Sequence, residues 1–370
     1  MQKVVTGATA AALALAAGCS DPAVPRTITV HAHGATLAAV DDGGGWQVHP
    51  AGDVVFDEPA GLYRVSVTCR PDIGDTTFVL AAPGDPAEYD LDCPEPTVQD
   101  DVTFDVTGAL HSLFIGEQYT YLPSEPLPVD RGRHDVVAIQ EDAPEQATRA
   151  QVIRDVDVDG ATRIAVDIGD DGVALAPIAA TLDPAYDDFA DLLVVGGETA
   201  AGTYFSIYAR PPVALPASVL VDGDEQWLRL DHLDVGAAPV YRQAVRTIVG
   251  GAVDLPLPVV DTTATFTADP RPALTWSTLG TWDAFSFSFE QDNEYGVPGW
   301  RLLASHSALE QAGALAAFDP PPGWRSSWTV DLAGYYRWSA RASRTIAGDA
   351  DGWEAITQGG GVYNPVPPPR

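Results

Sequence analysis

The feature that most constrains the fold of this chain is the alternation of apolar and polar residues in short runs. In Tyr63-Arg64-Val65-Ser66-Val67-Thr68-Cys69 every second residue is apolar, and Glu88-Tyr89-Asp90-Leu91-Asp92-Cys93 has the same period. A period of two places successive side chains on opposite faces of a strand. Segments rich in Gly, Pro and Asp separate such runs and favour turns. A chain of 370 residues is too long for one ordinary β-domain, so we expect a mainly β protein built from tandem β-sandwich domains.

The N-terminus carries a second informative pattern. Lys3 precedes the apolar run from Val4 to Ala17, which is too short to span a bilayer. The end of this run and the residues after it, Leu13-Ala14-Leu15-Ala16-Ala17-Gly18-Cys19-Ser20, resemble the lipobox of bacterial lipoproteins. That resemblance implies that residues 1–18 are a cleaved signal peptide and that Cys19 is lipidated with two or more acyl chains, enough for a stable anchor. The alternatives for the same residues are an ordinary secretory signal and a buried helix.

The residue after Cys19 bears on localisation. In Gram-negative lipoproteins an Asp at that position favours retention in the inner membrane, whereas here Ser20 stands there and Asp21 follows. The resemblance therefore implies an extracytoplasmic protein anchored in the outer membrane, with residues 19–26 as the lipidated tether. The first expected partner is the membrane itself, through the N-terminal lipid.

Two further cysteines, Cys69 and Cys93, form an even pair in a chain routed to an oxidising compartment, so we expect a disulfide between them. Both lie on the apolar faces of their predicted strands, within a β-sandwich at residues 27–95. The runs Gly34 to Leu37, Asp41 to Gly45 and Pro59 to Val67 resemble the transthyretin-like, carboxypeptidase-regulatory type of domain.

The same pattern continues to the C-terminus. We expect a β-sandwich at 96–178, a β-rich middle domain at 179–260, an aromatic-rich β-sandwich at 261–364 and a Pro-rich tail at 365–370. Within the aromatic-rich domain, Pro272-Ala273-Leu274-Thr275-Trp276 resembles the first core strand of fibronectin-type-III-like sandwiches. Ser307-Ala308-Leu309-Glu310 predicts a capping box that opens a short helix.

The charge excludes one class of partner. The formal net charge is -32, from 20 basic and 52 acidic residues. A surface this acidic repels the phosphates of nucleic acids. We therefore expect no nucleic-acid partner.

The aromatic residues supply the candidate ligand-binding positions. Eight of the nine tryptophans lie at or after position 227. Trp328 and Trp338 fall on apolar strand faces and are expected to pack in a core. Trp300, Trp324 and Trp353 fall in predicted loops, where exposed rings could anchor an envelope protein or stack on a glycan.

Two patterns in the sequence are candidates for metal sites. His31 and His33 lie on one face of a predicted strand, opposite the buried Ile28 and Val30, and this spacing suits zinc, but a third ligand such as His49 would have to come from elsewhere. The run Asp155-x-Asp157-x-Asp159-Gly160 resembles the start of an EF-hand loop, but Val166 stands where the bidentate Glu is needed. The sequence alone therefore predicts no metal and no cofactor.

No catalytic motif is present. The chain has no Gly-x-Ser-x-Gly elbow, no His-Glu-x-x-His, no phosphate-binding loop and no dinucleotide fingerprint. The acidic residues are too numerous for the sequence to select a glycosidase pair. We expect a lipid-anchored cell-envelope protein with a binding or structural role and no catalytic site. The alternative is a surface polysaccharide-active hydrolase or a carbohydrate-binding lipoprotein.

Overall fold

A computed structural model of the chain describes residues 26–70, 75–94, 97–108, 112–184, 191–234, 240–248, 251–267, 272–291, 299–316, 319–325, 328, 335–346 and 349–363. The signal peptide, Cys19, nearly all of the tether and the Pro-rich tail lie outside these residues. The described chain is mainly β, as the alternation predicted, with its strands arranged in several sheets. Among the described residues, no helix has the length and apolar character needed to cross a bilayer.

The N-terminal unit is a sandwich of two sheets. A three-stranded sheet in the order β4-β1-β7 faces the run β6-β5-β2-β3. Apolar residues of both layers, such as Ile28, Val30 and Val65, fill the space between them. The strands are β1 (Thr27–Ala32), β2 (Leu37–Asp41), β3 (Trp46–His49), β4 (Gly52–Asp57), β5 (Tyr63–Thr68), β6 (Thr76–Ala81) and β7 (Glu88–Asp90).

The second unit is a sandwich with two sheets of its own, in the orders β10-β9-β12-β13-β15 and β11-β8-β14. Phe104, Ile115 and Val136 belong to its core. Its elements are β8 (Gln99–Thr107), β9 (Ser112–Ile115), β10 (Gln118–Thr120), β11 (Leu127–Asp130), β12 (Gly132–Glu141), β13 (Ala147–Val158), β14 (Thr162–Asp167), α1 (Ile168–Asp171) and β15 (Val173–Ala174).

The middle unit places two short sheets, β16-β20 and β17-β23, beside the longer strands. Its core includes Leu228 and Leu230 and continues to Phe114 and Val137 of the second unit. The strands are β16 (Ala176–Pro177), β17 (Ala179–Leu182), β18 (Leu192–Glu198), β19 (Tyr204–Ile207), β20 (Val213–Ala214), β21 (Glu225–Asp234), β22 (Val240–Thr247) and β23 (Ala252–Leu255).

The C-terminal unit packs a small sheet, β24-β25-β28, and a helix over longer strands. Phe285, Phe287 and Phe289 lie on one face of a strand and are buried, as their alternation predicted. The elements are β24 (Ala264–Thr267), β25 (Ala273–Trp276), β26 (Ala284–Gln291), β27 (Gly299–Ser305), α2 (His306–Ala312), β28 (Leu315–Ala316), β29 (Tyr335–Ile346) and β30 (Asp349–Tyr363).

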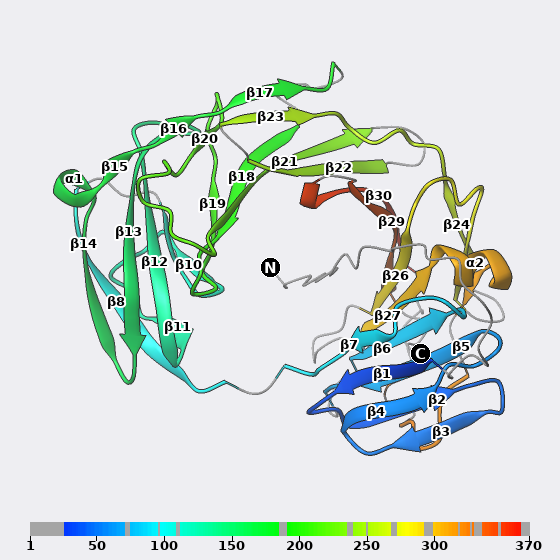
Figure 1. Ribbon diagram of the computed structural model, residues 1–370. Coiled ribbons are helices and arrows are strands. Elements are labelled where there is room, and N and C mark those ends of the chain that lie inside the picture. Colours follow the sequence, from blue (N-terminus) through cyan, green and yellow to red (C-terminus); the bar gives the residue numbers. More distant parts are fainter. Residues whose placement is uncertain are drawn as a thin grey trace, which may run out of the picture.

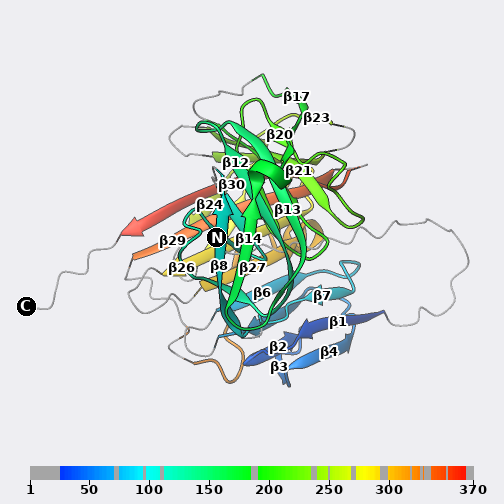
Figure 2. The same ribbon diagram turned by 90° about the vertical axis from the view of Figure 1, so that its left-hand side faces the viewer.

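One sheet runs through three of the four units. Its twelve strands have the order β19-β18-β21-β22-β30-β29-β26-β27-β6-β5-β2-β3. The first unit joins the last where β6 pairs in parallel with β27, and the middle unit joins the last where β22 pairs with β30. Figure 1 shows the units following an arc, with β1–β5 at one end and β8–β14 at the other, and Figure 2 shows β1–β4 and β17 at opposite ends of the molecule. The predicted units are therefore linked by continuous hydrogen bonding rather than by linkers alone.

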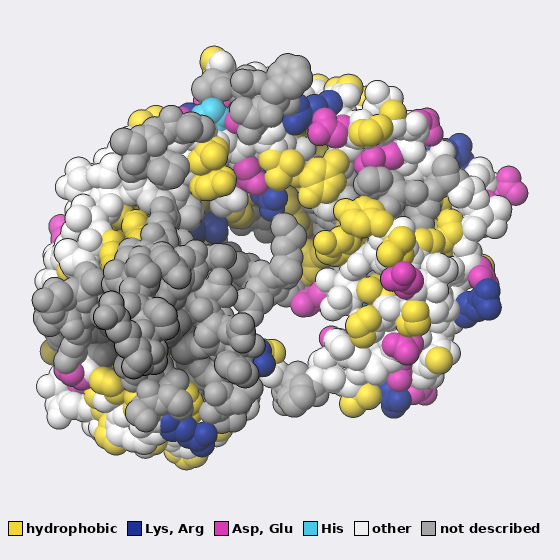
Figure 3. All heavy atoms as spheres, turned by 180° about the vertical axis from the view of Figure 1, so that it is seen from behind, with side chains coloured by type: hydrophobic (Ala, Val, Ile, Leu, Met, Phe, Trp, Pro, Cys, Tyr) yellow, Lys and Arg dark blue, Asp and Glu magenta, His cyan; other side chains and the backbone are white. Residues whose placement is uncertain are grey.

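Charged residues reinforce the junctions between units. Glu354 of β30 is buried and accepts hydrogen bonds from Arg246 of β22 and from Arg344 of β29. On the face shown in Figure 3, the acidic and basic side chains of the described residues are interspersed and form no single acidic patch. On this face, the acidic side chains of the described residues are therefore dispersed.

Candidate functional site

The predicted disulfide is present. Cys69 and Cys93 are bonded, with Cα atoms 5.2 Å apart. Both cysteines contact the core of the N-terminal sandwich. Cys19, the other functional cysteine of the sequence analysis, lies outside the described residues, so its lipidation stays a prediction.

Trp300 and Trp324 do not form an exposed surface. Trp300 lies in β27 rather than in a loop, is only 8% exposed, and donates from Nε1 to the carbonyl oxygen of Trp328 at 3.0 Å. Trp324 is half-buried, with its ring 6.0 Å from that of Trp300 and 5.8 Å from that of Phe78. The prediction of an exposed Trp300 is wrong because the parallel junction of β6 with β27 needs large apolar side chains to cover it, and this cluster supplies them.

Trp353 also lies in a strand, β30, and is half-buried. The guanidinium carbon of Arg341 stands 4.6 Å from the centre of a Trp353 ring, in a cation–π contact. Burial lowers the pKa of Arg341, and the charge of Asp231 opposes that shift. Trp353 is therefore a structural partner of an arginine, and it shares no described ring contact with Trp300 or Trp324.

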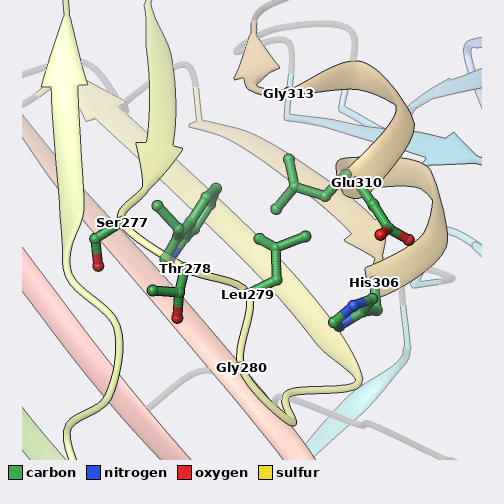
Figure 4. A pocket seen from close by; sticks show the side chains of 9 residues that line it. Ser277, Thr278, Leu279, Gly280, His306, Glu310 and Gly313 are labelled. Atoms are coloured by element: carbon green, nitrogen blue, oxygen red, sulfur yellow. The ribbon is translucent and has the colours of Figure 1, made fainter.

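The C-terminal unit instead offers a hollow of about 380 Å³ between the β25–β26 loop and α2. This volume is in the range of small-molecule sites. In Figure 4, Ser277, Thr278 and Leu279 lie on the loop side, and His306 and Glu310 project from the helix. The residues that line it are Trp276, Ser277, Thr278, Leu279, Gly280, His306, Leu309, Glu310 and Gly313.

Helix α2 is held firmly beside this hollow. Its N-cap is Ser305, whose hydroxyl accepts from the Ala308 amide at 3.0 Å, so the helix begins two residues earlier than the predicted capping box placed it. The hydroxyl of Ser307, predicted as the cap, instead donates to Asp85 at 2.5 Å. Gly313 ends the helix with a φ of 73°, in the left-handed region that favours glycine.

The wall of the hollow is aromatic and its rim is polar. The Trp276 ring is half-buried and packs edge-on against Phe285 at 5.0 Å. His306 Nδ1 donates to the carbonyl oxygen of Trp282 at 2.8 Å, which leaves Nε2 as the acceptor nitrogen of the neutral ring. The hollow thus combines an apolar ring, a hydrogen-bond acceptor and the carboxylate of Glu310.

The hydroxyl groups of the hollow are engaged in holding its loop. The Ser277 hydroxyl accepts from the Thr263 amide at 2.9 Å, and the Thr278 hydroxyl donates to the Asp261 carbonyl at 3.2 Å. Neither is hydrogen-bonded to His306, so the lining holds no nucleophile–base pair. Glu310 is the one carboxylate among the nine lining residues, whereas glycoside hydrolysis generally uses two.

Sequence reasoning missed this hollow. The sequence pattern places Trp276 on a core strand and does not single out His306. Leu274 and Trp276 share a strand face, and this parity is visible in the sequence. The loop and helix that leave Trp276 half-covered follow from tertiary packing, which the sequence pattern does not encode.

The two metal patterns had different outcomes in the structure. His31 and His33 face solvent as predicted, and one ligand atom from each lies within 4.8 Å of a carboxylate oxygen of Asp53. The third member of the cluster is thus Asp53 rather than His49. Asp155, Asp157 and Asp159, which are also among the described residues, form no such group.

These features define a mainly β protein of tandem sandwiches, tied together by one long sheet and carrying a small aromatic and polar hollow near its C-terminus. Comparison of the chain with protein-family models, with curated protein sequences and with solved structures found no match.

Proposed function

We propose that this protein is a lipid-anchored component of the cell envelope that binds a ligand through its C-terminal unit and has no catalytic site. The observation that carries the binding role is the hollow between the β25–β26 loop and α2. Its polar groups hold the walls in place and present one acceptor nitrogen and one carboxylate, without an activated nucleophile.

The long sheet supports the structural part of this proposal. A binding protein on a membrane gains affinity when its site is held in one geometry, because less freedom is lost on association. The hollow itself is lined by the end of β25, the β25–β26 loop and α2, but the loop leads into β26 and α2 follows directly from β27, and both of these strands belong to the long sheet. Through the predicted lipid on Cys19, the N-terminal sandwich would keep the hollow close to the outer membrane.

A glycan is the second candidate ligand, favoured by the half-buried ring of Trp276 beside polar groups. Sugar rings stack on aromatic side chains through their apolar faces while their hydroxyls need hydrogen-bond partners. The single carboxylate of the lining favours carbohydrate binding over hydrolysis.

The anchor is tested by Cys19→Ser. Mass spectrometry of the mature N-terminus of the unchanged chain should find Cys19 as the first residue, carrying diacylglycerol and an acylated amine. The Cys19→Ser variant should move from the membrane fraction to the soluble fraction. A variant that still fractionates with membranes would show that another part of the chain holds it there.

The binding role is tested by Trp276→Ala in the full chain. Thr275→Ala is the matched control, because Thr275 lies on the same strand with its exposed side chain on the opposite face. We expect binding to a glycan array or to isolated envelope material to fall at least tenfold in Trp276→Ala and to persist in Thr275→Ala. Equal binding by both variants would exclude the hollow as the site, and release of sugar from the array would favour the hydrolase.

A further inference from the structure

A histidine–carboxylate cluster lies on the solvent face of the N-terminal sandwich, far along the chain from the hollow. His31 is on the central strand β1, directly opposite Asp53 of β4. On the other side of β1, the parallel strand β7 begins with Glu88. Glu88 pairs with Thr29, which lies two residues before His31 on β1. Directly paired residues, and residues two apart on one strand, share a face of the sheet. The side chains of His31, Asp53 and Glu88 therefore point to the same side.

One nitrogen of each imidazole, which we call the inner nitrogen, faces the carboxylate of Asp53. His31 Nδ1 lies 2.7 Å from Asp53 Oδ1, and His33 Nε2 lies 3.5 Å from the same oxygen. The rings are stacked, with centroids 6.3 Å apart and planes 12° from parallel. Three metal-ligating groups, from β1, from the turn directly after β1 and from β4, therefore face a common point.

Each outer nitrogen has a carboxylate of its own. His31 Nε2 lies 2.8 Å from Glu88 Oε1, and His33 Nδ1 lies 2.8 Å from Asp92 Oδ1. A carboxylate accepts the N–H of the outer nitrogen, which leaves the lone pair of a neutral ring on the inner nitrogen. Metal-binding histidines are usually oriented by such a second carboxylate, which fixes the tautomer and makes the imidazole a stronger ligand.

We propose that His31, His33 and Asp53 bind a divalent transition-metal ion of the zinc type, through His31 Nδ1, His33 Nε2 and a carboxylate oxygen of Asp53. Glu88 and Asp92 orient the two imidazoles. Two imidazoles with one carboxylate suit zinc, whereas calcium and magnesium prefer sites made of oxygen ligands alone.

The distances suit this ion after small side-chain movements. Ligand atoms around a tetrahedral zinc lie about 3.4 Å apart when each metal–ligand distance is about 2.0–2.1 Å. The distance from His33 Nε2 to Asp53 already has this value, and the one from His31 Nδ1 has to open by about 0.7 Å. The side chains of His31, His33 and Asp53 are 27%, 53% and 54% exposed, so they can move, and the fourth position is open to water or to a donor from another molecule.

The backbone around the cluster is held in place. The Leu91 and Cys93 amides donate to the carbonyls of His31 and His33 at 2.9 Å, so the chain after β7 runs beside β1. Asp92 lies between these residues, and the adjoining Cys93 is tied to Cys69. The disulfide therefore keeps Asp92 against His33 whether or not a metal is bound.

A proton is the competing occupant. Without metal, hydrogen bonds from His31 to Glu88 and to Asp53 raise the pKa of the imidazole to about 9. The ring then carries both protons and bridges two carboxylates. A metal ion has to displace the Nδ1 proton, so the test has to distinguish an ion-pair network from a metal centre.

The test is titration of the chelator-treated, full-length chain with Zn²⁺, by calorimetry and by NMR of the histidine ring nitrogens. Cys19→Ser is present throughout, so that no free thiol competes for the metal. We expect one saturable Zn²⁺ per chain, with the resonances of His31 Nδ1 and His33 Nε2 shifted and those of the outer nitrogens retaining their protons. Ca²⁺ and Mg²⁺ should not displace it.

Variants separate this site from general attraction of cations to an acidic surface. His33→Gln and Asp53→Asn should weaken Zn²⁺ binding by at least a hundredfold, and Asp92→Asn by about 10–100-fold. His49→Gln, a histidine of the same sandwich outside the cluster, should bind Zn²⁺ like the parent chain. An intact disulfide and an unchanged circular dichroism spectrum establish that each variant is folded. The proposal would be overturned if Zn²⁺ left the His31 and His33 resonances unchanged, or if it bound the variants as tightly as the parent chain. The cluster would then be an ion-pair network in which protons, not a metal ion, link the imidazoles to the carboxylates.

Discussion

At the scale of single residues, Arg154 holds the second unit to the middle unit. Its guanidinium lies 2.7 Å from Asp135 of β12 and 2.6 Å from Asp224, which precedes β21, and it donates to the Val219 carbonyl at 2.7 Å. Asp224 also accepts from the amides of Val221 and Ala200. Burial alone would raise the pKa of Asp224, but the hydrogen bonds from Arg154 and the two amides outweigh it and lower that pKa below 3.8.

Asp224→Asn tests this junction. The folded protein holds Asp224 ionised more strongly than the unfolded chain does, so the carboxylate contributes stability that is fully present above pH 3.8 and is lost as the pH falls through its lower folded-state pKa. We expect the variant to lower the free energy of unfolding by about 2 kcal/mol at pH 7. The difference from the parent chain should narrow below pH 3.8, as measured by urea unfolding at pH 7 and pH 3.

The neighbouring Asp222 is exposed and provides the control. Asp222→Asn should change the urea midpoint little at either pH. If Asp224→Asn cost the same at pH 3 as at pH 7, the effect would come from packing rather than from the carboxylate charge.

Strand parity made part of the histidine cluster predictable. The alternation places Tyr89, Leu91 and Cys93 on the apolar face of their strand, and Glu88 and Asp92 alternate with them on the face that His31 and His33 share. Parity does not tell which strands are neighbours, so neither Asp53 nor the carboxylates behind each imidazole could be assigned from the sequence. The burial of Trp300 could not be predicted for the same reason, because β6, the neighbour that buries it, lies more than 200 residues away in the chain.

At the scale of elements, β7 depends on the disulfide that follows it. This strand has three residues, and β1 is the one strand that pairs with it in the described part of the chain. A short edge strand contributes little stability by itself. The bond from Cys93 to Cys69 closes the chain with a sequence separation of 24 residues and keeps the segment after β7 near β5.

Replacing both cysteines, as Cys69→Ser with Cys93→Ser, should lower the free energy of unfolding of the N-terminal sandwich by about 3 kcal/mol, from the greater freedom of the unfolded chain. The measurement is urea unfolding followed by the amide signals of β1 and β5. Reduction of the parent chain is the matched comparison and should give a similar loss. A double variant as stable as the oxidised parent would mean that packing alone fixes β7.

At the scale of the whole molecule, the long sheet is the feature that no local sequence pattern predicts. Alternation predicted most of its strands, including β5 and β26, because each depends only on neighbouring residues. The order in which they pair depends on shape and burial across the whole chain. The units proposed from the sequence at 27–95, 179–260 and 261–364 contribute strands to one sheet, whereas the strands of the second unit form separate sheets.

A shared sheet predicts shared stability. Phe287 of β26 is fully buried in the C-terminal core, and Phe287→Ala should cost about 3–5 kcal/mol there. Because β27 pairs with β6 and β30 pairs with β22, opening of the C-terminal strands leaves edges on both neighbours. We expect faster hydrogen exchange of the Val65 amide in β5 and of the Leu228 amide in β21. These two residues belong to other hydrophobic cores than Phe287 does.

Phe104→Ala is the matched control, since Phe104 is also buried but lies in the separate sheets of the second unit. It should accelerate exchange at Ile164, its partner in β14, and leave Val65 unchanged. If Phe287→Ala also left Val65 and Leu228 unchanged, the units would unfold independently in spite of their shared hydrogen bonds. The sheet would then connect three units that unfold separately, and a ligand in the hollow near α2 could not influence the N-terminal sandwich. If exchange rises at both sites, the three units of the long sheet form one cooperative body, and binding at the hollow and at the histidine cluster would each stabilise the other.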